Sequence, residues 1–211
     1  MAINPIDIKK DLDALALQDK QVAEAIGHYG YPEPRVWPSG FEIFLSIIVS
    51  QQISTQAART ILGRVRDLFD GQPDANALLA LPDGALRTAG LSGRKVEYVT
   101  GLARAIIEER FSPAKLLLME NNEAIDYIVS LRGFGRWSAE IYLMFSLQRP
   151  DIFPADDLAI RKSLQNLKGL ENCPTAGQAR EIVEHWEPHR SVGSLFLWHS
   201  YKGLKETNTK N

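Results

Sequence analysis

Apolar residues recur at helical spacing along almost the whole chain. Residues 41–69 carry two such runs, which are separated by the polar stretch 51–55. The same spacing predicts further helices over residues 92–106, 121–131, 138–147, 155–167, 175–183 and 192–201. Ser92 and Thr175 stand where a helix N-cap is expected. Alternating β-branched runs are absent, and the few short extended candidates are flanked by proline. The pattern predicts an all-α fold.

Two glycines interrupt this pattern at residues 131–139, which read Leu-Arg-Gly-Phe-Gly-Arg-Trp-Ser-Ala. Glycine permits positive φ, so Gly133 and Gly135 allow a turn tighter than side chains permit. The unpaired amides and the dipole at the start of the next helix favour an anion, to which Ser138 can add a hydroxyl. Arg136 lies beside them. A Gly-x-Gly alone also suits an ordinary helical connection, but the whole string indicates a backbone grip on a phosphate.

A pair of acids, Asp156 and Asp157, follows Pro154 one helix later. A fixed carboxylate can stabilise positive charge that develops during a reaction, and a helix N-terminus favours the ionised form. Asp and Asn are also common helix caps. From the residues alone, catalysis and capping both stay open for this pair.

Composition limits the possible classes of protein. The chain has 211 residues, of which 45% are hydrophobic, without a run long enough to span a membrane. The N-terminal residues lack a signal-peptide core, so we expect an intracellular protein. The single Cys173 excludes an internal disulfide, a cysteine zinc site and a four-cysteine iron–sulfur cluster. The net charge of −2 argues against a nonspecific DNA coat but permits a local basic face.

These motifs together resemble the helix–hairpin–helix DNA glycosylase superfamily. Residues 133–139 and the string Phe-Pro-Ala-Asp-Asp-Leu-Ala-Ile-Arg-Lys at 153–162 resemble its 3-methyladenine DNA glycosylase II branch, and residues 48–58, 90–95 and 190–198 agree. The similarity covers about residues 40–200 and fits the compact form, without the extra N-terminal domain of larger bacterial members. It implies one glycosylase domain, 1–211, in which two helical lobes, 40–150 and 1–39 with 151–211, flank a cleft for DNA.

The resemblance also implies residue roles in catalysis. Asp157 matches the catalytic aspartate, which leaves Asp156 as the expected cap. Members that also cut the strand use a lysine at the position of Trp137, so we expect a monofunctional enzyme that leaves an abasic site. Trp137 and Trp198 match residues of the base pocket, where an indole attracts a cationic alkylated purine. Ile141 stands where relatives often have an aromatic residue, with Tyr142 next to it.

DNA contacts are implied in the same way. Gln52 matches the residue that fills the gap left by a flipped base, and Ser54 the one that reaches the minor groove. The backbone carbonyls of Val129, Leu131 and Gly133 match those that hold a monovalent cation, Na⁺ or K⁺, against a DNA phosphate. We expect no cofactor for catalysis, neither zinc nor an iron–sulfur cluster.

The expected partner is double-stranded DNA with a damaged base, bound by a monomer in a bacterial cytoplasm and nucleoid or in a eukaryotic nucleus. The expected reaction is hydrolytic excision of alkylated purines of the 3-methyladenine and 7-methylguanine type. Two alternatives stay open. The same machinery could excise another base, such as etheno-adenine, uracil or a mismatched base. The chain could also be a non-catalytic helix–hairpin–helix module that binds DNA.

Overall fold

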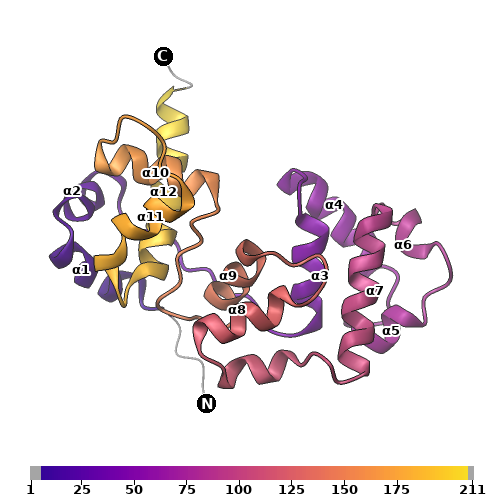
Figure 1. Ribbon diagram of the computed structural model, residues 1–211. Helices are drawn as coiled ribbons and strands as arrows, with labels where there is room; N and C mark the ends of the chain where they lie inside the picture. The colour runs from indigo at the N-terminus through magenta and orange to yellow at the C-terminus, as the bar shows by residue number, and fades with distance from the viewer. Residues whose placement is uncertain (1–5, 209–211) are drawn as a thin grey trace. The chain divides into compact units, whose positions relative to one another are not determined.

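The computed structural model describes the backbone of residues 6–208, and the side chains as far as Tyr201. Over these residues the chain is helical without a strand, which confirms the all-α prediction (Figure 1). The helices are α1 (Ile8–Gln18), α2 (Lys20–Tyr29), α3 (Phe41–Ser50), α4 (Thr55–Arg66), α5 (Ala75–Leu79), α6 (Ala85–Thr88), α7 (Gly93–Ile107), η1 (Pro113–Leu118), α8 (Asn121–Val129), α9 (Arg136–Phe145), α10 (Leu158–Lys168), α11 (Ala176–Ile182), η2 (Glu184–Trp186) and α12 (Arg190–Asn208). None of the described helices is both long enough and apolar enough to cross a membrane.

Side-chain caps set the helix boundaries. The Ser92 hydroxyl accepts a hydrogen bond from the Lys95 N–H at the start of α7, as the sequence predicts. Thr175 and Gln178 form a reciprocal capping box at the start of α11. The helix expected over 155–167 begins three residues later, because Asp157 caps it from outside. Local hydrogen bonding of polar side chains therefore decides where the apolar periodicity becomes helix.

The chain divides into two compact units. The central unit is Trp37–Tyr142, and the terminal unit combines Met1–Val36 with Leu143–Asn211. Residues 143–150, which the sequence suggests for the central lobe, belong to the terminal unit. The reason is Gln148, whose buried amide donates to the Arg35 carbonyl at 3.0 Å and accepts from the Ile6 N–H at 3.2 Å. A buried amide has to find such partners, so it ties the segment to the N-terminal residues.

The terminal unit packs α1, α2, α10, α11 and α12 around one apolar cluster, which includes Leu12, Leu15, Ile160, Trp186 and Phe196. Helices α10 and α12 pack against each other in it (Figure 1). Trp186 is completely buried in this cluster.

A buried carboxylate holds the terminal unit together. Asp19 caps α2 and also accepts hydrogen bonds from the Trp186 indole at 2.7 Å, from His185 at 3.1 Å and from the Lys168 ammonium. Burial raises the pKa of Asp19, but the bonds from Lys168, Trp186 and His185 outweigh it and bring that pKa down to about 2. In the folded protein the Asp19 carboxyl group is therefore ionised at neutral pH.

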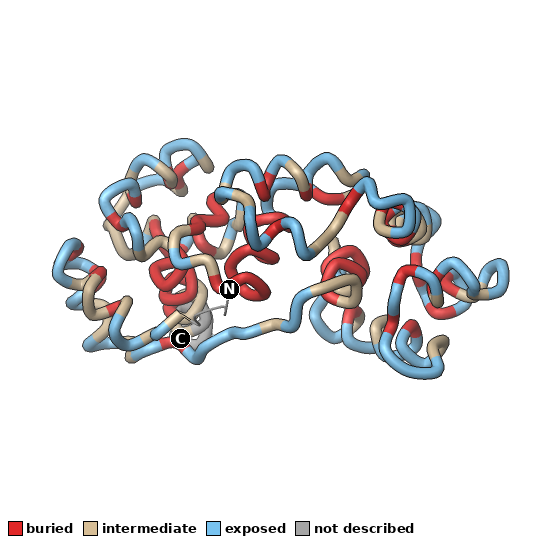
Figure 2. The backbone as a smooth tube through the Cα atoms, turned by 90° about the horizontal axis from the view of Figure 1, so that it is seen from below, coloured by how far each residue is buried: buried red, intermediate tan, exposed pale blue. Residues whose placement is uncertain are grey.

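The central unit has its own aromatic core on the inner face of α3. The Phe44 ring stacks on Tyr142, with centroids 4.2 Å apart, and meets Phe111 and Phe134 edge-on. Helix α7 packs against α3 and α5. Figure 2 shows buried positions recurring along the helices between exposed ones, as amphipathic helices require.

Candidate functional site

The two hairpin glycines connect α8 to α9 and have different surroundings. Gly133 has φ +98°, and a Cβ built on it would lie 2.4 Å from Cγ of Tyr98. Only glycine fits there, because both the conformation and the close approach exclude a side chain. Gly135 is exposed, and a Cβ on it would meet no atom within 4 Å. The Gly135 backbone is therefore accessible to a ligand at the start of α9.

The first turn of α9 differs in part from expectation. Arg136 is exposed and pairs with Glu140, with 2.9 Å between Nε and Oε1. Ser138 is only 4% exposed, so its side chain is almost covered in this structure, and its contact with a phosphate stays a prediction. Its position falls on the inner face of α9, next to the fully buried Ala139. Anion binding at this helix start can use the backbone and Arg136.

The polar break between α3 and α4 forms a turn, residues 51–54, which we call the wedge turn. Gln52 is exposed at its tip with φ +55°. The Ser54 hydroxyl accepts a hydrogen bond from the Ala57 N–H at 3.2 Å and so caps α4. Gln51 donates from Nε2 to the Gly133 carbonyl at 2.8 Å. The central unit thus brings the wedge turn and the hairpin into direct contact.

The three carbonyls expected to hold a cation belong to this hairpin. The Leu131 carbonyl accepts from the Phe134 N–H at 3.1 Å, and the Gly133 carbonyl accepts from Gln51. A carbonyl oxygen has two lone pairs, so each can still face an ion. Neutral oxygen ligands of this kind fit a cation of low charge. Within the described residues, His, Cys, Asp and Glu form no cluster suited to a metal ion.

Of the pocket residues predicted on α9, Trp137 is 37% exposed, whereas Ile141 and Tyr142 are buried. Tyr142 stacks on Phe44, and its hydroxyl accepts a hydrogen bond from the Gly40 N–H at 3.4 Å. Burial raises the pKa of the Tyr142 phenol. Both side chains therefore belong to the packed interior of the central unit, and their assignment to the base pocket stays a prediction.

Asp157 lies in the terminal unit, immediately before α10. Its Oδ1 accepts hydrogen bonds from the Ala159 N–H at 2.8 Å and from the Ile160 N–H at 3.1 Å. The prediction that Asp156 is the cap is wrong, because Asp156 is exposed and lies 3.4 Å from the Arg180 guanidinium. Two backbone amides at the helix N-terminus therefore orient the Asp157 carboxylate.

Trp198 is half-buried on α12 of the same unit. The Arg35 guanidinium lies 5.8 Å from the centre of its indole ring and 5.7 Å from that of Phe145. The sequence offered no sign of this contact, since Arg35 precedes Trp198 by most of the chain. One cation, the Arg35 guanidinium, therefore already lies within cation–π distance of this indole.

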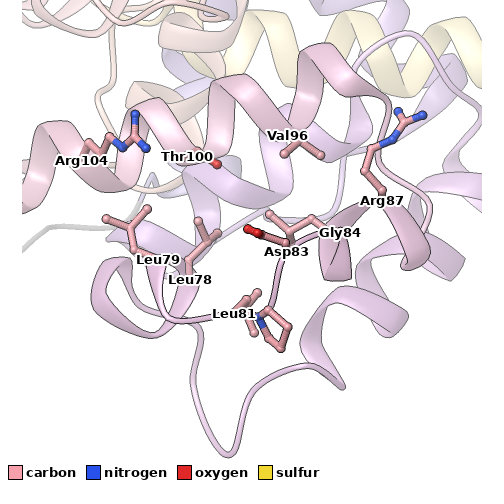
Figure 3. Close-up of a pocket in the computed structure, with 11 residues that line it drawn as sticks. Leu78, Leu79, Leu81, Asp83, Gly84, Arg87, Val96, Thr100 and Arg104 are labelled. Atoms are coloured by element: carbon pink, nitrogen blue, oxygen red, sulfur yellow. The ribbon is translucent and has the colours of Figure 1, made fainter.

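A cavity of about 210 Å³ lies elsewhere in the central unit (Figure 3). Val96, Thr100 and Arg104 project into it from α7, opposite residues 78–87. None of the predicted site residues lines it, so this cavity is separate from the expected base pocket.

Known proteins identify the family to which this arrangement belongs. Residues 45–188 match the sequence model of the HhH-GPD superfamily of base excision DNA repair proteins. The chain belongs to this superfamily. The resemblance drawn from the hairpin and the acid pair is thereby confirmed, together with the helix–hairpin–helix glycosylase fold.

Relatives within the superfamily carry specific names. The chain is 28% identical to DNA-3-methyladenine glycosylase 1 of Schizosaccharomyces pombe, over 87% of this chain and 82% of that protein. It is 34% identical to the DNA-3-methyladenine glycosylase of Saccharomyces cerevisiae, over 96% of this chain and 75% of that protein. Both similarities extend well beyond the hairpin.

Solved structures of proteins with similar names also share the fold of this chain. The DNA-3-methyladenine glycosidase of Bacillus halodurans superposes with a TM-score of 0.84 at 29% identity, covering 93% of this chain and 91% of that one. The Schizosaccharomyces pombe 3-methyladenine DNA glycosylase, solved in complex with abasic DNA, gives a TM-score of 0.83 at 27% identity, covering 92% and 97%.

Proposed function

We propose that the protein is a DNA glycosylase that flips an alkylated purine out of double-stranded DNA and hydrolyses its N-glycosidic bond. The relatives named above are 3-methyladenine glycosylases, which supports this substrate class. The observation that carries the proposal is Asp157, whose carboxylate is oriented by two backbone N–H groups at the start of α10.

The chemistry requires such a group. As the base departs, positive charge builds on the sugar, and a fixed carboxylate stabilises that charge without having to reorganise. Asp157 can also orient the attacking water. Removing a single preorganised electrostatic partner of this kind typically costs a hundredfold or more in rate.

The hairpin binds the DNA backbone in this proposal. The amides at the start of α9 and the side chain of Arg136 contact a phosphate, which approaches over the exposed Gly135. A Na⁺ or K⁺ on the carbonyls of Val129, Leu131 and Gly133 would add positive charge at the same phosphate.

Base recognition combines a pocket and a wedge. Trp137 and Trp198 are the exposed and half-buried indoles that would hold a cationic purine, at about 0.5–2 kcal/mol for each favourable cation–π contact. Gln52, exposed at the tip of its turn, fills the gap that the flipped base leaves, and Ser54 follows it along the minor groove.

The enzyme removes the base without cutting the strand. The position that would carry a lysine nucleophile is Trp137, whose indole nitrogen cannot form a Schiff base with the sugar. The product is therefore an intact strand with an abasic site. In this proposal the enzyme acts as a monomer on cellular DNA, in a nucleoid or a nucleus.

Base release from duplexes that each contain one defined lesion tests the proposal. We expect release of 3-methyladenine and 7-methylguanine by the natural protein, and a loss of at least a hundredfold for Asp157→Asn. Asparagine is as good an N-cap as aspartate, so α10 is preserved. Asp156→Asn is the matched control and should keep activity within about twofold, because Asp156 only meets Arg180 at the surface.

Binding separates catalysis from DNA recognition. Asp157→Asn should bind a duplex with an abasic analogue within a few-fold of the natural protein. Retention of both alkylated bases by the natural protein would refute the substrate class. Undiminished release by Asp157→Asn would refute the mechanism.

A further inference from the structure

The wedge turn has an unfavourable backbone conformation at Gln52, the residue proposed to fill the gap in the base stack. Gln52 has φ +55°, in the left-handed region that a non-glycine residue adopts only at a cost in free energy. Its side chain is exposed. Since such a conformation persists only when its surroundings enforce it, the neighbouring contacts have to supply that constraint.

Two partly buried side chains hold the chain just before Gln52. Gln51 donates from its amide to the Gly133 carbonyl at 2.8 Å. Lys95 donates from Nζ to the Val49 carbonyl at 2.6 Å, in the last turn of α3. A cation is favourable there, because the last carbonyls of a helix lack helical partners and carry its negative end. Burial lowers the pKa of Lys95, but its ammonium still has this acceptor.

The first half of α7 supports the hairpin as well. Tyr98, one turn after Lys95, lies directly under Gly133. Glu97 forms an ion pair with Arg132 of the hairpin at 2.5 Å. Helix α7 therefore contacts the end of α3 through Lys95 and the hairpin through Tyr98 and Glu97. Gln51, which follows α3, connects the end of that helix directly to the hairpin through its bond to the Gly133 carbonyl.

We propose that Gln51 and Lys95 are positioning residues that fasten the wedge turn to the phosphate-binding hairpin, so that Gln52 enters the base stack at a set distance from the gripped phosphate. This inference rests on the proposed function. Neither side chain touches the DNA. Because they hold the turn in place beforehand, no conformational free energy is needed to order it when a base is flipped. Such preorganisation accelerates a reaction.

The role predicts a dependence on substrate that a purely structural role lacks. Flipping costs most from a paired duplex and least from a single strand. A loosened wedge turn therefore slows excision from duplex DNA selectively. A loss of folding would lower excision from both substrates by the same factor.

The test uses Gln51→Leu and Lys95→Met, which keep the apolar bulk and remove the donors. Single-turnover release of 7-methylguanine is measured from one oligonucleotide, as a duplex and as a single strand. Gln52→Ala removes the wedge side chain itself and serves as the reference variant. We expect it and each positioning variant to lose about tenfold on the duplex and less than twofold on the single strand. The double variant Gln51→Leu/Gln52→Ala should lose no more excision rate on the duplex than Gln52→Ala alone, because the effects of substitutions that disturb the same interaction are not additive. Gln56→Leu, at an exposed position of α4, is the matched control.

A second measurement does not need catalysis. A 2-aminopurine beside an abasic site reports by its fluorescence how far the wedge unstacks the duplex. At saturating protein, Gln51→Leu should give less than half of the natural increase. Equal losses on both DNA forms, additive effects or an unchanged fluorescence increase would each overturn the positioning role. Failure of the natural protein to release any base, with the fluorescence difference intact, would instead refute only the proposed reaction.

Discussion

Substituting alanine for Gly133 is the most informative single perturbation of the hairpin. The added Cβ would lie 2.4 Å from Cγ, 2.5 Å from Cδ2 and 2.9 Å from Cβ of Tyr98. These atoms belong to the near end of the tyrosine side chain, which cannot swing away by changing a terminal rotamer. The backbone would also have to hold φ +98° with a side chain present.

The two effects can be sized separately. The unfavourable φ costs about 1–3 kcal/mol. Overpacking against a well-fitted neighbour costs about another 1–3 kcal/mol. We therefore expect Gly133→Ala to lower the free energy of unfolding by about 4 kcal/mol. At about 2–4 °C per kcal/mol for a chain of this size, the melting temperature should fall by about 8–16 °C.

Gly135→Ala is the matched control, because it makes the same chemical change two residues away. Its Cβ would meet no atom within 4 Å, so the unfolding free energy should stay within about 1 kcal/mol of the natural value. DNA affinity should nevertheless fall, since the methyl group stands where a phosphate approaches. Calorimetry measures stability, and fluorescence anisotropy with a labelled abasic duplex measures affinity.

A third variant tests the steric step. Combining Gly133→Ala with Tyr98→Ala removes the contacts with Cγ and Cδ2 but keeps the contact with Cβ at 2.9 Å and the strained φ. The double variant should therefore still be destabilised, but less than the sum of the single losses predicts. Stability of Gly133→Ala within about 1 kcal/mol of the natural protein would refute the assigned overlap. Equal DNA affinity for Gly135→Ala and the natural protein would refute the assigned path of the phosphate.

Three further predictions concern the terminal unit and the reaction. Asp19→Ala leaves the Lys168 ammonium and the Trp186 indole without their buried acceptor, and should cost about 3 kcal/mol in urea unfolding; a loss below about 1 kcal/mol would contradict this. Because the folded pKa of Asp19 is about 2, below its unfolded value, its contribution is complete above about pH 4 and declines as the pH falls towards 2; Asp19→Asn should lack this decline. Borohydride added during base excision should trap no covalent adduct with DNA, since Trp137 supplies no amine, and a trapped adduct would reveal another nucleophile.

Elements with a strong local signal were predictable from the sequence. The two runs in residues 41–69 became α3 and α4, with the break where the polar stretch falls. Ser92 and Thr175 cap the helices that they were expected to cap. In each case, the residues that decide the structure lie within a few positions of one another, so periodicity and capping chemistry contain the answer.

The features that could not be predicted from the sequence depend on tertiary contacts. Tyr142 follows Ile141 on a helix that periodicity places correctly, but only its contact with Phe44 shows that the ring belongs to the core. Gln148 joins the terminal unit through the carbonyl of Arg35, more than a hundred residues away. The bond from Gln51 to Gly133 spans 82 positions and leaves no trace in local composition. Such pairings depend on how helices pack, which a single sequence does not encode in its spacing.

Asp157 shows that capping and catalysis are compatible interpretations of one residue. From the sequence, the two roles could be divided between Asp156 and Asp157, but the structure assigns the cap to the residue proposed as the catalyst. The amides of Ala159 and Ile160 that stabilise the helix end also fix the direction of the carboxylate. A substitution that removes the cap would disturb fold and chemistry together. Asparagine keeps the cap and removes the charge, so it isolates the electrostatic contribution that the proposed reaction requires.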